Sequence, residues 1–140
     1  MRLWHKDLIP VLPRQQLLGQ WRECCLIARS IKETGSPNHI LVNKIMDYPI
    51  SDFYHYGMLV SQELLRRYYK CDFNKFSQHF DDPSSMGIEF DQAALFKDWH
   101  NDRYLRQCFC NLQEKFDCGG VPVAQWAEVV CFMQGRPVSK

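Results

Sequence analysis

The sequence predicts a single all-α domain with three main helices, several short ones and an extended N-terminal arm. Three stretches repeat apolar residues every three or four positions, which is the period of an amphipathic helix. No stretch alternates apolar and polar residues for long enough to form a strand. The 140 residues suffice for a full hydrophobic core, so we expect one domain with an arm (1–12), a helical region (13–75) and additional helices (76–140).

The arm, residues 1–12, contains Pro10 and shows no helical period. We expect it to lie extended across the domain, held by its apolar side chains Leu3, Trp4, Leu8 and Ile9. The first helix then follows from Pro13, which suits a first helical turn because its missing N–H is not needed there. Breaker residues at 34–38 end this helix near Glu33.

At about 100° per residue, the first helix carries one apolar stripe; the stripe comprises Leu17, Leu18, Trp21, Cys24, Cys25 and Ala28. Glu23 lies on the opposite side, which it shares with Gln16, Gln20 and Ile27. The apolar Ile27 indicates that this side is partly covered. Arg22 and Arg29, seven residues apart, form a basic edge. The alternative interpretation is an ordinary surface helix with solvated charges.

Further helices are predicted at 39–46 and from Asp52 to Tyr69, the second capped by Ser51 and Asp52. The expected buried side chains of the second are Phe53, Met58, Leu59, Leu64 and Leu65. Its basic end, 66–70, suits the helix dipole, and phosphate contact is the alternative.

Residues 71–90 are predicted to be irregular and to be held down by three aromatic side chains, Phe73, Phe76 and Phe80. A third helical region should begin near Asp91, break around 99–102 and stop at Gly119. A last short helix is expected over 123–133.

Charge is distributed unevenly although the net charge is only +1. Residues 1–70 hold ten Lys/Arg and six Asp/Glu, whereas residues 71–140 hold seven and ten. A basic half of this kind permits contact with a polyanion. No apolar run approaches the roughly 20 residues that span a bilayer, and the N-terminus lacks the apolar core of a signal peptide. We therefore expect a cytoplasmic protein without a membrane partner.

The seven cysteines cannot all pair within the chain, and no CxxC motif occurs. Reduced thiols in a cytosolic protein explain this pattern best. A zinc site built from His100, Cys108, Cys110 and Cys118 is conceivable, but its spacing differs from that of the usual zinc knuckles. No metal is expected.

Familiar catalytic motifs are absent: the sequence has no glycine-rich phosphate loop, HExxH or GxSxG. The segment WHNDRY, residues 99–104, is dense in polar and aromatic groups. Its His100, Asp102 and Arg103 could form a secondary site, or equally a helix cap with surface charges.

Residues 1–23, MRLWHKDLIPVLPRQQLLGQWRE, resemble the start of the pyrimidine-dimer DNA glycosylases, the endonuclease V type first known from a bacteriophage. These enzymes begin with a short arm, an arginine as the second residue and a helix with an aromatic-Arg-Glu triplet, here Trp21-Arg22-Glu23. The helix within 53–74 is also similar, down to a basic pair near its end. The resemblance covers roughly residues 1–75.

The resemblance implies a compact helical DNA-repair glycosylase and AP lyase that needs no cofactor. Its nucleophile would be the N-terminal amine, here that of Met1, because α-amino groups titrate at about 7.7–8.0 and lysines near 10.4. Attack on the sugar of a damaged pyrimidine nucleotide displaces the base and leaves a Schiff base, which permits β-elimination. By the same resemblance Glu23 stabilises the transition state, and Arg2, Arg22 and Arg29 hold the DNA.

The sequence departs from the family in three ways. The phage enzyme exposes a threonine amine after losing its methionine, whereas Arg2 is too large for ordinary removal of Met1. Gln16 replaces a DNA-contacting histidine, and the second half is acidic. The partner implied is double-stranded damaged DNA, bound by a monomer. The remaining hypotheses are a non-catalytic helical module that binds nucleic acid or protein, and an unrelated enzyme built around His100.

Overall fold

A computed structural model describes residues 1–136, and within that range the chain is helical without strands. The predicted all-α fold is therefore confirmed. The longer helices are α1 (Arg14–Thr34), α2 (Ile50–Arg66), α4 (Asp102–Asp117) and α5 (Val123–Gln134). The short ones are η1 (Lys6–Val11), η2 (Asn43–Asp47), α3 (Asn74–Ser77), η3 (Pro83–Met86) and η4 (Gln92–Ala94). The end of the predicted 76–140 region, 137–140, lies outside the described residues.

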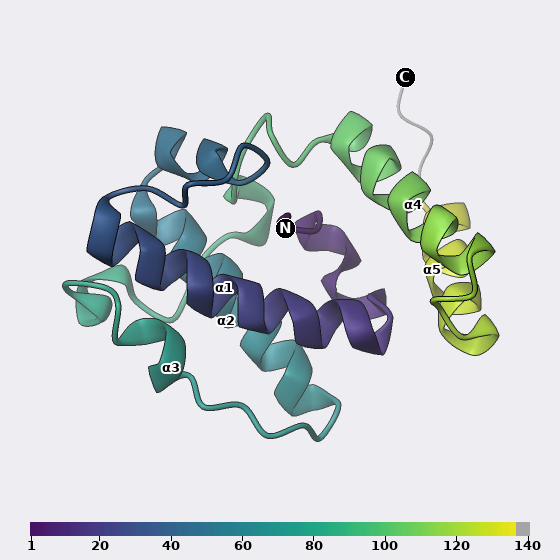
Figure 1. Cartoon of the computed structure of the whole chain (residues 1–140), viewed down its shortest axis with the longest axis horizontal. Coiled ribbons are helices and arrows are strands. Elements are labelled where there is room, and N and C mark those ends of the chain that lie inside the picture. The colour runs from purple at the N-terminus through teal and green to yellow at the C-terminus, as the bar shows by residue number, and fades with distance from the viewer. Residues whose placement is uncertain (137–140) are drawn as a thin grey trace.

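Helices α1 and α2 pack against each other and form the centre of the molecule (Figure 1). Gly57 of α2 allows α3 to approach closely, since a Cβ atom built there would lie 2.3 Å from Cζ of Phe76. Phe76 is fully buried, while Phe73 and Phe80 are half-buried around it. The predicted anchoring of the 71–90 segment by phenylalanines is confirmed.

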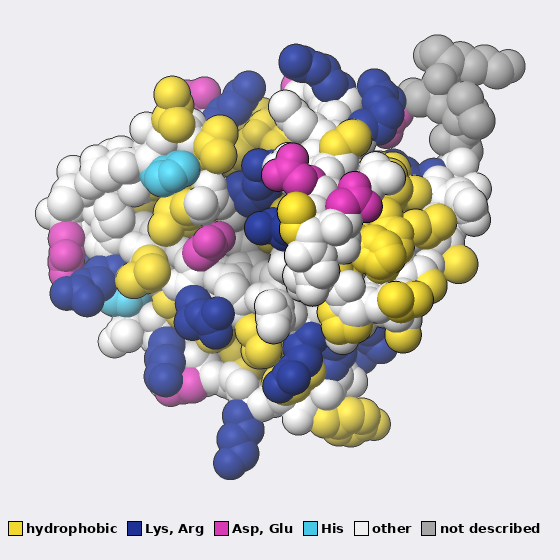
Figure 2. Space-filling view, turned by 45° about the vertical axis from the view of Figure 1, so that its right-hand side comes forward, with side chains coloured by type: hydrophobic (Ala, Val, Ile, Leu, Met, Phe, Trp, Pro, Cys, Tyr) yellow, Lys and Arg dark blue, Asp and Glu magenta, His cyan; other side chains and the backbone are white. Residues whose placement is uncertain are grey.

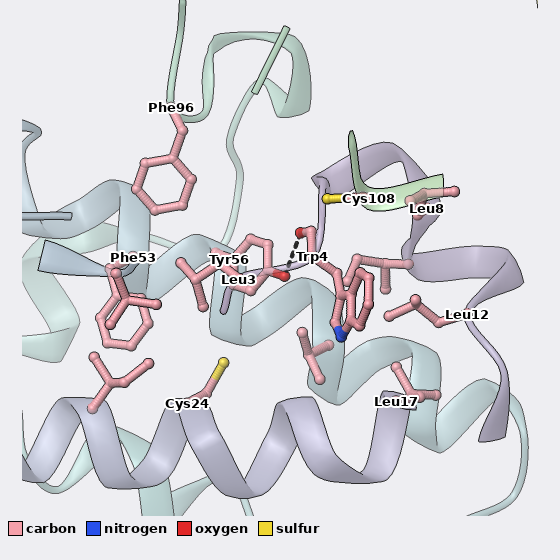
Figure 3. Close-up of a cluster of buried hydrophobic side chains, with 14 of the residues drawn as sticks. Leu3, Trp4, Leu8, Leu12, Leu17, Cys24, Phe53, Tyr56, Phe96 and Cys108 are labelled. Carbon is pink, nitrogen blue, oxygen red and sulfur yellow. Dashed lines mark hydrogen bonds between the residues drawn. The ribbon is translucent and has the colours of Figure 1, made fainter. Parts of the chain in front are cut away.

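The prediction of an extended arm was wrong for residues 6–11, which form the 3₁₀ helix η1. His5 favours this turn because its Nδ1 accepts the N–H of Asp7 at 3.0 Å. The predicted anchors Leu3, Trp4, Leu8 and Ile9 are all buried, as Figure 3 shows for the first three. A hydrogen bond within a short turn leaves no periodic signal in sequence, so the helix was missed.

The buried face of α1 is rotated from the predicted stripe. It contains Gln20 and Ile27, which are both almost fully buried, whereas Leu18 and Cys25 are only half-buried. The reason is that the arm lies against this helix, as the hydrogen bonds of Gln20 demonstrate. The expectation that the Glu23 side of the helix is partly covered is thereby confirmed.

The predicted caps of α2 were wrong: Pro49 precedes the helix, and no side chain caps its first turn. Asp52 instead accepts the backbone N–H of Phe96 at 3.1 Å and ties the later loop to the helix. Of the expected buried residues of α2, Leu65 is 54% exposed. In the predicted 39–46 helix, only 43–46 is helical, as part of η2. Of the apolar residues expected to face the core, only Ile45 is buried, whereas Ile40, Leu41 and Met46 are exposed.

Helices α4 and α5 pack against each other beside this centre (Figure 1), and α5 also touches η1. The expected break comes before α4, where Asn101 caps the helix by accepting the N–H of Tyr104. Trp126 of α5 stacks with both Phe109 and Phe116, each at 5.2 Å between ring centroids. Within the described residues, no helix is long and apolar enough to cross a membrane.

Candidate active site around the N-terminal arm

The buried amide of Gln20 holds the start of the chain on α1. Its Nε2 donates to the carbonyl of Arg2 at 3.0 Å, and its Oε1 accepts the N–H of Trp4 at 2.7 Å. The same oxygen also accepts the hydroxyl of Tyr56 at 3.0 Å. A side chain that satisfies both a donor and an acceptor of the arm fixes its register against the helix.

Two tyrosines hold backbone carbonyls of the same arm segment. The Tyr56 hydroxyl lies 2.6 Å from the carbonyl oxygen of Trp4 (Figure 3), and the Tyr104 hydroxyl donates to that of Leu3. Burial raises the pKa of both tyrosines well above the usual value, so both remain hydrogen-bond donors at physiological pH. Leu3 and Trp4 are thus held from α1, α2 and α4 together.

Met1 precedes the segment that Gln20 holds, and Glu23 follows Gln20 along α1. Met1 is 41% exposed and precedes Arg2, whose carbonyl is held by Gln20. Glu23 follows Gln20 by three residues, slightly less than one helical turn, and is half-buried. Its charge also contributes to the raised pKa of Tyr56, after burial and the effects of Cys24, Tyr104 and Cys108. The start of the chain is therefore held at Gln20, within one helical turn of Glu23 along α1.

The predicted DNA contacts divide into two groups. The Arg2 guanidinium lies over the Trp4 ring, 5.2 Å from its centroid, and its charge partly offsets the burial that raises the pKa of Tyr104 and Cys108. Gln16 lies one turn before Gln20, and its Oε1 is buried and finds no hydrogen-bond partner among residues 1–136. Gln16 lies two helical turns before Glu23 on the same side of α1, and Arg2 belongs to the arm segment that Gln20 holds. On the face drawn in Figure 2, both Lys/Arg and Asp/Glu side chains lie around a hollow near the centre.

Arg22 and Arg29 belong to a different surface. They are exposed and line a shallow groove of about 430 Å³ with Lys75 of α3, and Glu23 does not line it. Arg29 also forms an ion pair with Glu33 at 3.0 Å. The structure therefore does not bring this basic edge together with Met1 and Glu23.

The basic end of α2 supports the arm. The Arg67 guanidinium donates to the carbonyl of Leu12 at 2.8 Å and also reaches the carbonyls of Ile9 and Pro10. Glu63, which is 6% exposed, pairs with both Arg66 and Arg67. Arg67 is therefore occupied by the arm, and phosphate contact is not needed to explain its presence.

The secondary candidates His100, Asp102 and Arg103 point in three directions. His100 is buried, and its Nδ1 accepts the backbone N–H of Lys6 at 3.0 Å. Asp102 contacts Arg136 at 3.5 Å, whereas Arg103 is exposed on another surface. Burial lowers the pKa of His100 well below its usual value. This histidine is a neutral acceptor under the arm, and the three residues do not form one site.

The structure assembles no metal site from the conceivable zinc ligands. Cys108 is buried, whereas Cys110 and Cys118 are exposed. In residues 1–136, no three His, Cys, Asp or Glu side chains are grouped as metal ligands, and all seven cysteines are free thiols. Burial also raises the pKa of Cys108, which disfavours the thiolate that zinc requires.

The arm, α1, α2 and α3 together make up the part of the chain that matches a known family. A protein-family model described as pyrimidine dimer DNA glycosylase matches residues 1–77, more than half of the chain. This chain belongs to the pyrimidine dimer DNA glycosylase family. No curated protein and no solved structure matches it. The family suggested by the first 75 residues is confirmed.

The residues that contact the arm come partly from the family-matched range and partly from the chain after it. Gln20, Tyr56 and Glu23 lie within the matched residues, which end with α3. Tyr104 and His100 lie beyond them. Sequence reasoning missed Gln20, Tyr56 and Tyr104, although a glutamine between Leu17 and Cys24 on an apolar face was a usable signal for the first.

Proposed function

We propose that this member of the pyrimidine dimer DNA glycosylase family is a glycosylase and AP lyase that uses the Met1 amine as nucleophile and Glu23 as its catalytic carboxylate. The observation that carries the proposal is the double hydrogen bond of Gln20 to the arm. Because the chain start is held less than one turn from Glu23, a nucleophile and a carboxylate can meet one sugar.

The proposed reaction needs no group beyond these residues and the DNA. The Met1 nitrogen forms a bond to C1′ as the glycosidic bond breaks, and the base leaves with the electron pair and takes up a proton. Loss of a proton from nitrogen and opening of the sugar produce the imine. The Glu23 carboxylate then accepts the C2′ proton, and the C3′–O bond breaks in β-elimination. Water finally hydrolyses the imine and frees the amine.

The surroundings of Met1 and Glu23 suit this role. Met1 is exposed, so a DNA sugar can reach it, while the residues behind it are buried and hydrogen-bonded. A rigid support behind an accessible nucleophile reduces the entropy lost at the reacting geometry. Arg2 and Gln16 are the proposed contacts to the lesion nucleotide.

Borohydride trapping tests the proposal directly. Protein with a free Met1 amine, verified by mass, is incubated with abasic-site and cyclobutane-dimer duplexes, and the reduced imine should appear as a covalent complex on Met1. An N-terminal extension should abolish the complex. Glu23→Gln should reduce strand cleavage at least about 100-fold, within the usual range for removal of a general acid or base.

Glu33→Gln, on the exposed end of the same helix, is the matched control and should cleave normally. Absence of trapping on both duplexes would overturn the enzymatic proposal and leave a non-catalytic DNA- or protein-binding module.

A further inference from the structure

A groove of about 330 Å³ lies between the 40–44 segment and the start of α4. Its lining includes two cations, Lys44 and Arg103, one acid, Asp98, and the ring of Tyr104. Ile40 and Leu41 form an apolar part of the lining and are 86% and 50% exposed. We propose that this groove binds the backbone of the DNA strand beside the lesion, an inference that rests on the proposed function.

The two cations are available to an external anion. Lys44 and Arg103 are both exposed, and neither forms an ion pair among residues 1–136. The helix itself does not favour Arg103, because a positive charge in a first turn opposes the helix dipole. Charge complementarity therefore favours a phosphate-bearing strand.

Tyr104 connects the groove to the chain start. Tyr104 lines the groove, while its hydroxyl donates to the carbonyl of Leu3 in the arm. A strand that follows the groove past Tyr104 would thus approach the arm only two residues from Met1. The apolar side chains Ile40 and Leu41 offer a surface for an unstacked base, as in other grooves that hold single strands.

Substitution of Asp98, the acid in the groove lining, should have the opposite effect on DNA binding. Its backbone has a φ of 70°, in the left-handed region, which asparagine adopts readily. Asp98→Asn therefore removes the acid without backbone strain. If phosphates lie in the groove, this change should tighten DNA binding, whereas loss of Lys44 and Arg103 should weaken it.

The test measures binding of a duplex with a non-cleavable abasic analogue by fluorescence anisotropy between 50 and 300 mM salt. The Lys44→Gln/Arg103→Gln double variant should lower the slope of log K against log salt by about 1 to 2, since each phosphate contact contributes about 0.9. Trapping at saturating DNA should remain. Lys115→Gln, at the other end of α4, should keep the wild-type slope.

If the slope is unchanged in the double variant while trapping is intact, the proposal that the groove binds DNA is wrong and the enzymatic proposal still stands. If the double variant reduces the slope but the protein never forms a trapped complex, DNA binding by the groove is supported and the enzymatic proposal is wrong. If the wild-type protein binds no DNA, both proposals fail.

Discussion

Helices α2 and α5 are both rich in apolar residues, yet they are used very differently. Ten of the 17 residues of α2 are buried, whereas Val129 is the single buried residue among the 12 of α5. Helix α2 is covered by α1 and the arm, and Phe76 of α3 lies against Gly57, while α5 packs on α4 and η1. Apolar side chains gather at the right of the face in Figure 2. Helix burial thus depends on the neighbouring elements more than on composition.

The same contrast separates the family-matched part from the rest. Residues 1–77 supply most of the buried cluster and the proposed catalytic pair, while later residues supply Tyr104 and His100 to the arm. The residues after 77 therefore act on the site mainly through hydrogen bonds to backbone groups of the arm. The following substitutions test this difference, in order of decreasing expected effect.

Gly57→Ala should cost about 3 kcal/mol or more in the free energy of unfolding, because its Cβ would overlap the buried Phe76 ring. Urea denaturation measures this. Gly19→Ala is the matched control: its Cβ would meet no atom closer than 3.9 Å, so it should stabilise α1 by about 0.5–1 kcal/mol. Equal effects of the two changes would mean that α2 and α3 are not tightly packed.

Acid should destabilise the contact between the arm and the residues around His100. Burial lowers the pKa of His5 and His100, whose rings stack at 5.1 Å beside Tyr104 and Lys6. The unfolded chain then binds protons that the folded chain does not, so stability should be full above about pH 6.5 and fall below it. The slope should approach about 1.4 kcal/mol per pH unit for His100, whose pKa is lowered well below its usual value, and should be smaller for His5.

His100→Gln keeps an acceptor for the Lys6 N–H and should remove one histidine's share of that slope. Thermal or urea unfolding between pH 4.5 and 7.5 measures it. A wild-type protein whose stability does not change over this range would contradict the prediction.

Tyr104→Phe should have the smallest effect on stability, about 1 kcal/mol, because it removes one hydrogen bond and keeps the ring. If Tyr104 positions the arm, imine trapping should slow about tenfold at saturating DNA, as misplacement of a reacting group does. Tyr48→Phe is the matched control, because its hydroxyl also donates to a backbone carbonyl, that of Lys97, away from the arm. Equal trapping rates in both variants would remove Tyr104 from the site.

Local sequence patterns were enough for the helical framework. The apolar period predicted α1, the main part of α2, α4 and α5, since such a period reflects one face against a core. The triplet at Trp21 and the arm composition also indicated the family, which the match over residues 1–77 confirmed. Glycine and proline marked most helix ends, because their backbone limits act locally.

Only the tertiary structure decided which side of α1 faces the arm and what holds the chain start. Gln20 reaches Arg2 and Trp4 over 18 and 16 residues, and Tyr104 reaches Leu3 over 101. Arg22 and Glu23 are neighbours in sequence, yet their side chains serve different surfaces of one helix. Contacts over such separations depend on how helices pack in space, and no local period records them.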